Sequence, residues 1–256
     1  MVSTTAEVRP WTPGDRPPGP SALAGGGPLL WSVRPWGLRP PGPSGQSGQS
    51  GQSGQPMSPD GLDVLDEEER RRVAAFRRPE DRVMYAASHT ALRVLLGSVL
   101  EVPPARVTLV RLPCPGCGAL HGRPAVAGPA GDRVHFSLSH TEGLALVALA
   151  ARPVGVDVER LPSARTATEA ASALHPLEQA ELAALAVADR PAAFARCWTR
   201  KEAYLKGTGE GLSGEALGGA HLGTGPSPAA QPAGWTLADV EVPTGFVAAC
   251  AVAAAR

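Results

Sequence analysis

The spacing of apolar residues divides the chain into an N-terminal stretch without periodicity and a longer part with helical and strand patterns. Residues 9–27 show little apolar periodicity, and residues 44–55 repeat the sequence SGQ four times. Between them, residues 28–34 (PLLWSVR) alternate weakly and indicate one strand. Gly, Ser and Gln bury too little apolar surface to offset the entropy of ordering. We therefore interpret residues 1–59 as a flexible segment with a first strand at 28–34. Alternatively, the whole prefix is disordered, or translation starts at Met57.

Helical spacing begins after this segment. Acidic residues and then arginines at 66–72 suit the dipole of a helix. Pro79 can open a second helix, because proline is tolerated in the first turn, and apolar residues recur at helical spacing to about Leu100. Residues 166–188 and 191–206 show helical patterns in the second half.

Strand patterns alternate with these helices. The continuous apolar run LALVALAA predicts a buried strand at 144–151. Further strands are expected at 106–112, 133–138, 154–159, 235–242 and 245–254, with a loop at 207–234. Helices followed by antiparallel strands, twice over, predict an α+β fold with two pseudo-repeated halves, each with helices packed on a small antiparallel sheet. The expected division is a prefix (1–59), an N-terminal half (60–151) and a C-terminal half (152–256).

Composition excludes several classes of protein. Lysine plus arginine is 24 and aspartate plus glutamate is 24, so the net charge of zero argues against a nucleic-acid binder. Four cysteines are too few for a disulfide scaffold. No uninterrupted apolar run reaches the roughly 18–20 residues that cross a bilayer, and the N-terminus lacks a secretory signal. We expect a cytoplasmic protein that binds neither nucleic acid nor membrane.

Lysine is the rare cation of this chain. It occurs only at positions 201 and 206, and the other 22 of the 24 cations are arginine. An ammonium contacts a phosphate or carboxylate at one point, whereas arginine presents a planar fork. The two lysines therefore either serve such a site or are surface lysines retained by chance.

Asp157 and Glu159 share one face of the predicted strand 154–159, because they are two residues apart. Adjacent carboxylates repel unless a positive charge lies between them, and Mg²⁺ is a natural partner. The alternative is a solvated strand face. Glu202 lies on a predicted helix with Lys206 four residues on, so the two side chains share a face. They form either an ordinary ion pair or a third acidic ligand beside a phosphate-binding lysine.

Two further motifs carry polar chemistry. Ser139 and His140 fall between two predicted strands. Neighbours on an extended chain point to opposite sides, so anion binding is favoured over a nucleophilic dyad. Cys114, Cys117 and His121 resemble half of a zinc knuckle. No second Cys-x-x-Cys completes it, so a tight turn with reduced thiols is favoured over a structural zinc site.

Three segments together resemble the 4′-phosphopantetheinyl transferases, in particular the larger Sfp-type with two pseudo-repeated halves. They are FSLSHT at 136–141, VGVDVE at 154–159 and WTRKEA at 198–203, the last with Lys206. The HGRP sequence at 121–124 is similar to the Gly-Lys/Arg-Pro segment of that family. The resemblance covers about residues 60–256, and the SGQ-containing prefix departs from the family pattern.

The resemblance implies a reaction and its partners. The phosphopantetheine arm of coenzyme A would pass to a serine of an apo acyl or peptidyl carrier protein of fatty acid, polyketide or nonribosomal peptide synthesis. The reaction would need Mg²⁺ and release adenosine 3′,5′-bisphosphate, and the enzyme would be a monomer. The alternatives are a non-catalytic coenzyme A- or carrier-binding protein with the same fold, and a zinc-dependent interaction module fused to a degraded enzyme.

The resemblance also implies roles for single residues. Asp157, Glu159 and Glu202 would hold Mg²⁺ on the pyrophosphate of coenzyme A, and Glu202 would be the base for the acceptor serine. Lys206 would neutralise an α-phosphate oxygen. The expected contacts to the nucleotide are His140 with Ser139 at the phosphates, Arg123 with Pro124 in the Gly-Arg-Pro turn, and Arg72 at the 3′-phosphate.

Overall fold

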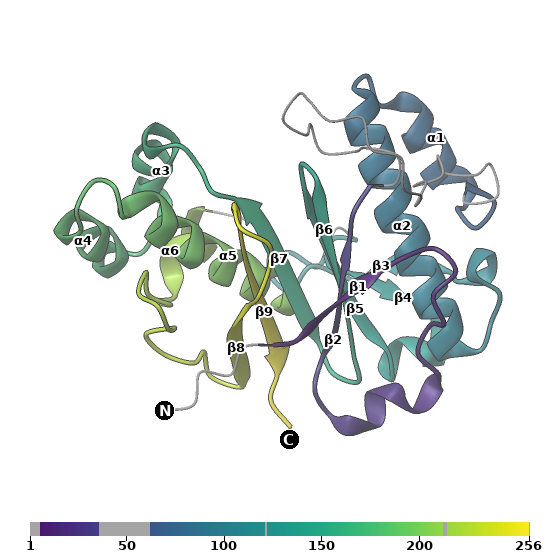
Figure 1. The fold of residues 1–256 in the computed structure, drawn as a ribbon. Coiled ribbons are helices and arrows are strands. Elements are labelled where there is room, and N and C mark those ends of the chain that lie inside the picture. The colour runs from purple at the N-terminus through teal and green to yellow at the C-terminus, as the bar shows by residue number, and fades with distance from the viewer. Residues whose placement is uncertain (1–5, 36–61, 121, 212–213, 256) are drawn as a thin grey trace, which may run out of the picture.

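Two sheets lie face to face in the middle of the molecule, and a long helix covers the outer face of each (Figure 1). The structure, a computed structural model, describes residues 6–35, 62–120, 122–211 and 214–255. The SGQ repeats, Met57 and His121 lie outside the described residues. Helices packed on small sheets confirm the predicted α+β class, while the relation of the two halves as repeats stays a prediction.

The first sheet contains a strand from the N-terminal segment as an inner member. Its order is β1 (Val8–Trp11), β2 (Leu29–Val33), β6 (Leu144–Ala150) and β5 (His135–Thr141). Strands β1 and β2 run parallel, joined by a crossover through the 3-10 turn η1 (Pro20–Gly25), and the other pairs are antiparallel. The expectation of a purely antiparallel sheet is therefore wrong for this half. The wide crossover permits the parallel pair, which a tight hairpin cannot make.

The second sheet is antiparallel, in the order β7 (Val154–Arg160), β9 (Phe246–Ala253) and β8 (Trp235–Val240). The two sheets enclose a core of aliphatic side chains, among them Leu30, Leu144, Leu146, Val154, Val156 and Val158. All seven residues of β6 are buried, because the inter-sheet core takes one face of the strand and a helix takes the other. Burial on both faces explains the continuous apolar run in the sequence.

Helix α2 (Pro79–Leu100) covers the first sheet and α5 (Arg190–Thr208) covers the second. The most apolar 18-residue window of α2 would pass for a membrane span by composition, but 72% of it is buried inside the protein, as expected of a core helix. Helix α5 ends at Thr208 and is capped by Gly209, whose φ of 84° lies in the left-handed region.

The remaining elements are short. They are α1 (Glu67–Ala75), η3 (Pro104–Arg106), β3 (Leu109–Arg111), β4 (Pro124–Val126), η4 (Gly128–Asp132), α3 (Ala164–Ala170), η5 (Ala171–Ala173), α4 (Pro176–Ala184) and α6 (Gly214–Gly219). Asp66 and Glu69 form a capping box at the start of α1. The predicted loop 207–234 contains α6, a helix too short to show periodicity, which buries Leu217.

Candidate active site

Two glycines allow α5 to lie directly on β7. A Cβ on Gly155 would stand 1.9 Å from the carbonyl oxygen of Ala203, and a Cβ on Gly207 would stand 2.6 Å from the ring of Trp235. Any larger side chain would therefore push the helix away from the strand. This close approach carries Glu202 and Lys206 to the side of Asp157.

Four of the predicted residues meet at this contact, from three different elements. The Nζ atom of Lys206 lies 2.5 Å from Oδ1 of Asp157 and 3.4 Å from Oε2 of Glu202. Ser139, on β5, donates a 2.7 Å hydrogen bond to Oδ1 of Asp157 and accepts a 3.0 Å hydrogen bond from Lys206. The side chain of Asp157 is only 1% exposed. Of these contacts, the sequence predicted only the pair of Glu202 with Lys206.

Negative charge exceeds positive charge in this cluster. Burial, followed by the fields of Asp157 and Glu202, raises the pKa of Glu159 to about 7. Burial and Asp157 also raise the pKa of Glu202, which forms a hydrogen bond with the side chain of Trp198. Burial opposes the charge of Lys206, but Asp157 and Glu202 outweigh it and raise the pKa of this ammonium.

The cluster suits a hard cation in its chemistry. Oδ2 of Asp157 is buried and has no hydrogen-bond partner among the described residues. A buried carboxylate oxygen without a partner is costly unless a donor or cation meets it, and Mg²⁺ prefers oxygen ligands. In the described part of the chain, however, no group of three or more His, Cys, Asp or Glu is placed as a ready metal cage. Lys206 contacts two of the three carboxylates instead. The metal ligands therefore stay a prediction.

A cavity of 520 Å³ opens beside the cluster. Its lining includes Arg72, Arg123, Pro124, His140 and Lys206, five of the six residues expected to bind the cofactor. The sixth, Ser139, does not line it, because its hydroxyl is engaged with Asp157, Lys206 and the N–H of Val158. Ser139 thus positions Asp157 in this structure, and its contact with phosphates beside His140 stays a prediction.

Arg72, Arg123 and Lys206 bring positive charge to the cavity, and no Asp or Glu is among the described residues that line it. Burial, followed by the fields of His89 and Lys206, lowers the pKa of His140. Burial also lowers the pKa of Arg123. Burial and the positive charge of Arg123 together lower the pKa of His135 to about 4. Cations hold their protons less readily where positive groups gather. A phosphate-bearing ligand would relieve this repulsion.

The cavity has an aromatic wall that sequence reasoning missed. The rings of Tyr85 and His89 stack with centroids 3.9 Å apart, and Phe76 packs against Tyr85. The guanidinium of Arg72 lies over the Tyr85 ring at 5.8 Å. Glu69 holds His89 through a 2.9 Å hydrogen bond. Tyr85 and His89 are four residues apart on α2, a spacing that puts both on one helix face and could have indicated this wall.

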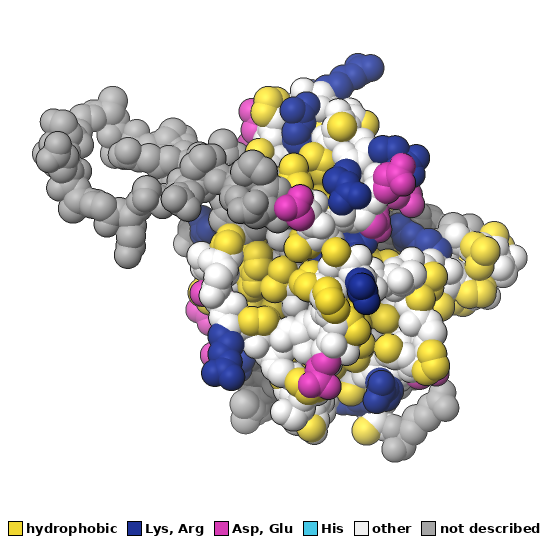
Figure 2. Space-filling view, turned by 90° about the vertical axis from the view of Figure 1, so that its right-hand side faces the viewer, with side chains coloured by type: hydrophobic (Ala, Val, Ile, Leu, Met, Phe, Trp, Pro, Cys, Tyr) yellow, Lys and Arg dark blue, Asp and Glu magenta, His cyan; other side chains and the backbone are white. Residues whose placement is uncertain are grey.

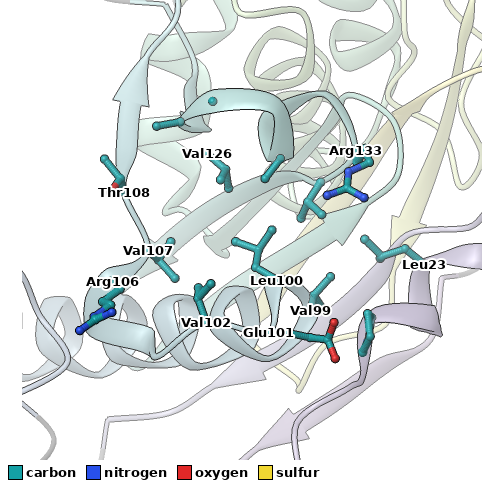
Figure 3. A pocket seen from close by; sticks show the side chains of 15 residues that line it. Leu23, Val99, Leu100, Glu101, Val102, Arg106, Val107, Thr108, Val126 and Arg133 are labelled. Carbon is teal, nitrogen blue, oxygen red and sulfur yellow. The ribbon is translucent and has the colours of Figure 1, made fainter.

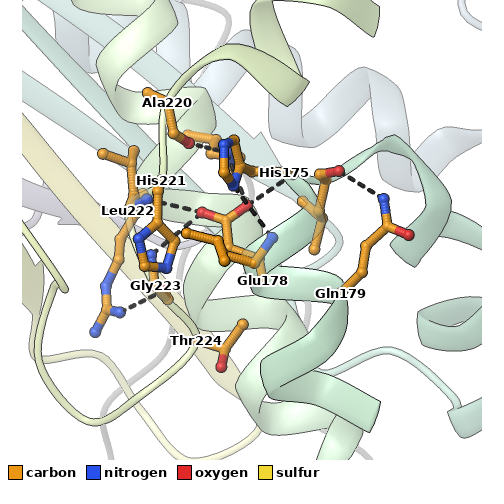
Figure 4. Close-up of polar contacts among 12 residues, drawn as sticks. His175, Glu178, Gln179, Ala220, His221, Leu222, Gly223 and Thr224 are labelled. Carbon is orange, nitrogen blue, oxygen red and sulfur yellow. Dashed lines mark hydrogen bonds and ion pairs between the residues drawn. The ribbon is translucent and has the colours of Figure 1, made fainter.

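The second lysine has a structural role. Lys201 is 2% exposed, forms a 2.9 Å ion pair with Glu178 and donates a hydrogen bond to the carbonyl oxygen of Ala220. Glu178 also accepts hydrogen bonds from the N–H groups of Leu222 (2.7 Å) and Gly223 (3.2 Å) (Figure 4). Lys201 is therefore not a surface lysine retained by chance. It makes a one-point contact to a carboxylate, that of Glu178, and it does not line the cavity of Arg72 and Arg123.

A second cavity, of 570 Å³, lies between the C-terminal end of α2, η1 and η4 (Figure 3). Its walls are mainly aliphatic, with Arg106 and Arg133 among the lining residues. Seen from the α2 side, hydrophobic side chains gather in the middle of the surface with charged side chains around them (Figure 2). None of the predicted site residues lines this cavity.

Comparisons with known proteins match this chain to one family of enzymes. Residues 153–225 match the family model of the 4′-phosphopantetheinyl transferase superfamily. The chain is 34% identical to the 4′-phosphopantetheinyl transferase HetI of a Nostoc species over 197 residues, which cover 74% of this chain and 78% of the relative. It is 30% identical to a phosphopantetheinyl transferase of a Thraustochytrium species (58% of this chain, 54% of the relative). It is also 30% identical to a 4′-phosphopantetheinyl transferase of Bacillus subtilis (36% and 40%).

Proposed function

Because this chain belongs to the 4′-phosphopantetheinyl transferase superfamily, whose enzymes modify carrier proteins with coenzyme A, we propose the following reaction for it. It transfers the 4′-phosphopantetheine arm of coenzyme A to a serine of an apo acyl or peptidyl carrier protein and releases adenosine 3′,5′-bisphosphate. Carriers of fatty acid, polyketide or nonribosomal peptide synthesis are all candidate acceptors. One observation carries the proposal: Asp157, Glu202 and Lys206 meet at the edge of a cationic cavity that would hold a nucleotide.

In this proposal the cavity binds the nucleotide of coenzyme A. Arg72 and Arg123 line it, and each presents a guanidinium that can pair with phosphate oxygens. Neutral His140 donates or accepts a hydrogen bond there at neutral pH, since its pKa is lowered. Pro124 is the first residue of β4 and keeps the Arg123 turn in place through the β3–β4 pairing.

The acidic cluster would hold Mg²⁺ through Asp157, Glu159 and Glu202. The metal, when bound, neutralises the charge that develops on the pyrophosphate. Attack on a pyrophosphate depends on in-line positioning and charge neutralisation more than on a covalent intermediate. The ammonium of Lys206, which already lies against two carboxylates, would neutralise an α-phosphate oxygen.

Glu202 would accept the proton of the acceptor serine, directly or through one water. Lys206 and Trp198 hold its carboxylate in place by hydrogen bonds. The carrier would approach the open side of the cluster, because Asp157 is sealed by Ser139 on the other side.

Mass spectrometry of an apo-carrier protein incubated with this protein, coenzyme A and Mg²⁺ tests the proposal. The carrier should gain about 340 Da, the mass of one phosphopantetheine. Glu202→Gln should abolish the gain and keep coenzyme A binding. Glu169→Gln, on the exposed face of α3, is the matched control and should retain full transfer. No gain on several carrier types, with coenzyme A still bound, would favour a non-catalytic binding protein.

We further propose that the protein acts as a monomer in the cytoplasm, without nucleic acid or membrane. Two halves within one chain already bring the residues of both into a single site. Light scattering that shows a stable trimer at micromolar concentration would contradict the monomer.

A further inference from the structure

A Cys-Pro-Gly-Cys turn forms the tip of the β3–β4 hairpin, and the proposed reaction makes no use of it. The N–H of Cys114 donates to the carbonyl oxygen of Ala119 (2.8 Å), and the N–H of Gly118 donates to the carbonyl oxygen of Cys114 (2.8 Å). Gly118 has a φ of 75°, which closes the turn in the left-handed region. These bonds hold Cys114 and Cys117 at fixed places on one turn.

The two thiols contact each other and differ in exposure. Cys114 is buried and Cys117 is exposed. The N–H groups of Cys117 and Gly116 point at the sulfur of Cys114, the side chain of Cys117 forms a hydrogen bond with it, and together they lower the pKa of the Cys114 thiol. An exposed thiol that can attack, next to a buried thiol that can displace the mixed disulfide, fits the two roles of a dithiol in thiol–disulfide exchange.

The other two cysteines provide a contrast within the same chain. Cys197 and Cys250 are buried, and burial raises the pKa of both thiols, that of Cys250 to about 12. Their thiolates are scarce at neutral pH, so they are inert in exchange reactions.

The turn is connected to the nucleotide cavity by the hairpin itself. The N–H of Leu112 donates to the carbonyl oxygen of Arg123 (3.1 Å), and the N–H of Gly122 donates to that of Leu112 (2.9 Å). Gly122 and Arg123 both line the cavity. The hairpin is crowded here, since a Cβ on Gly122 would lie 2.6 Å from the carbonyl oxygen of Leu112. We therefore expect a change in the turn to reach Arg123 through this hairpin.

We propose that Cys114 and Cys117 are a redox-active dithiol that exchanges with low-molecular-weight disulfides and closes into an intramolecular disulfide, which weakens coenzyme A binding at the neighbouring cavity. The effect on coenzyme A rests on the proposed function, whereas the exchange chemistry does not. The dithiol is thus a modification site on the hairpin whose residues Gly122 and Arg123 line the cavity.

The exchange has two steps. The thiol of Cys117 loses its proton, and the thiolate attacks one sulfur of a small disulfide RSSR. The S–S bond breaks and RS⁻ leaves, taking up a proton to become RSH. The thiolate of Cys114 then attacks the Cys117 sulfur of the mixed disulfide and releases the second RS⁻, which also becomes RSH. The cysteines together lose two electrons and two protons, and RSSR is reduced to two RSH.

Peptide mass spectrometry after incubation with glutathione disulfide tests the exchange. Trypsin cleaves after Arg111 and Arg133 but not between Arg123 and Pro124, so one peptide, 112–133, contains both cysteines and no other. This peptide should lose about 2 Da on oxidation, the mass of two hydrogens. The peptides with Cys197 and Cys250 should stay reduced and serve as internal controls.

Single variants resolve the order of the steps. Cys114→Ser should stop at a stable glutathione adduct on Cys117, a gain of about 305 Da. Cys117→Ser should form neither the disulfide nor an adduct. An adduct on Cys114 of Cys117→Ser, or no oxidation of the wild-type peptide, would overturn the dithiol. So would one zinc per purified chain that is released only when both thiols are alkylated, because it would show a metal site.

Calorimetric titration with coenzyme A tests the coupling. Oxidised protein should bind coenzyme A about fivefold or more weakly than reduced protein, and Cys117→Ser treated with the same oxidant should show no change. Equal affinity in the two states would overturn the coupling. Carrier modification by the reduced protein is measured separately, so failure of the redox proposal is distinguishable from failure of the proposed function.

Discussion

The hydroxyl of Ser139 donates a 2.7 Å hydrogen bond to Oδ1 of Asp157, so β5 of one sheet positions a carboxylate on β7 of the other. The same hydroxyl accepts from the N–H of Val158 (3.4 Å), and Ser137 accepts in the same way from the N–H of Val156 (3.1 Å). The two sheets are thus joined along β5 and β7 by serine side chains.

Replacement of Ser139 by alanine should impair both stability and transfer. The variant leaves Asp157 without its neutral donor, so we expect a loss of about 1–3 kcal/mol in the free energy of unfolding. Transfer should slow about tenfold or more, as when the support of a ligating carboxylate is removed. Urea unfolding and the carrier assay measure the two effects. Ser163→Ala, at the exposed start of α3, should leave transfer unchanged, and unchanged transfer in Ser139→Ala would contradict a positioning role.

Gly155→Ala should displace α5 from β7. The new Cβ would meet backbone atoms, the carbonyl oxygen of Ala203 at 1.9 Å and the nitrogen of Gly207 at 2.4 Å. Backbone atoms cannot rotate away, so we expect a loss of about 3 kcal/mol or more together with loss of transfer. Gly19→Ala has nothing within 4 Å of its new Cβ and is the matched control. Native-like stability and activity of Gly155→Ala would show that the helix approach is not required.

The Lys201–Glu178 pair should respond differently to single and double substitution. Lys201→Met leaves the buried carboxylate of Glu178 without its partner, so stability should fall by about 3–5 kcal/mol. In Lys201→Met/Glu178→Leu no charge is left buried, and stability should recover in large part. Thermal unfolding of the single and double variants decides this. If the double variant is as unstable as Lys201→Met, the main stabilising role of Glu178 is to accept hydrogen bonds from the N–H groups of Leu222 and Gly223, not to pair with Lys201.

A variant that starts at Met57 should not fold. It would lack β2, an inner strand that pairs with β6 and buries Leu30 and Val33. It would also lack β1 and the bridge from Ala6 to Val240 in the second sheet. Circular dichroism and size-exclusion chromatography should show an unfolded or aggregated chain. A variant with residues 44–55 deleted removes no described residue and should fold normally; a folded, active Met57 variant would contradict the need for the strand.

His135 should make stability fall in mild acid. Burial and Arg123, 3.5 Å away, lower the pKa of His135 to about 4, opposed only weakly by Asp132. The unfolded chain therefore binds a proton near pH 6.5, where the folded chain does not. The contribution of neutral His135 to the free energy of unfolding is complete above about pH 6.5, and it is lost progressively as the pH falls from there towards 4. In His135→Asn the unfolding midpoint should depend less on pH between about 4 and 6.5. A pH dependence equal to that of the wild type would show that other groups cause the loss of stability in acid.

Much of the fold was predictable from local pattern. Each of these patterns depends only on which faces of an element the neighbouring layers bury. They are the continuous apolar run of β6, the helical period of 3.6 in α2 and α5, and the alternation in β7. Asp157 and Glu159 share a face because strand geometry has a period of two. Glu202 and Lys206 share a face because helix geometry brings residues four apart together. These relations need no knowledge of the rest of the chain.

The tertiary structure alone decided which of these residues meet. Ser139 faces Asp157 rather than the cavity, Lys201 pairs with Glu178 while Lys206 joins the acidic cluster, and Tyr85 and His89 complete a wall of the cavity. The N-terminal strand β2 lies beside β6, more than a hundred residues later in the chain. Local sequence sets the period of a strand or helix, but contacts between distant segments depend on how the layers pack, and the close approach at Gly155 shows that packing at the scale of one methyl group determines where Glu202 and Lys206 lie.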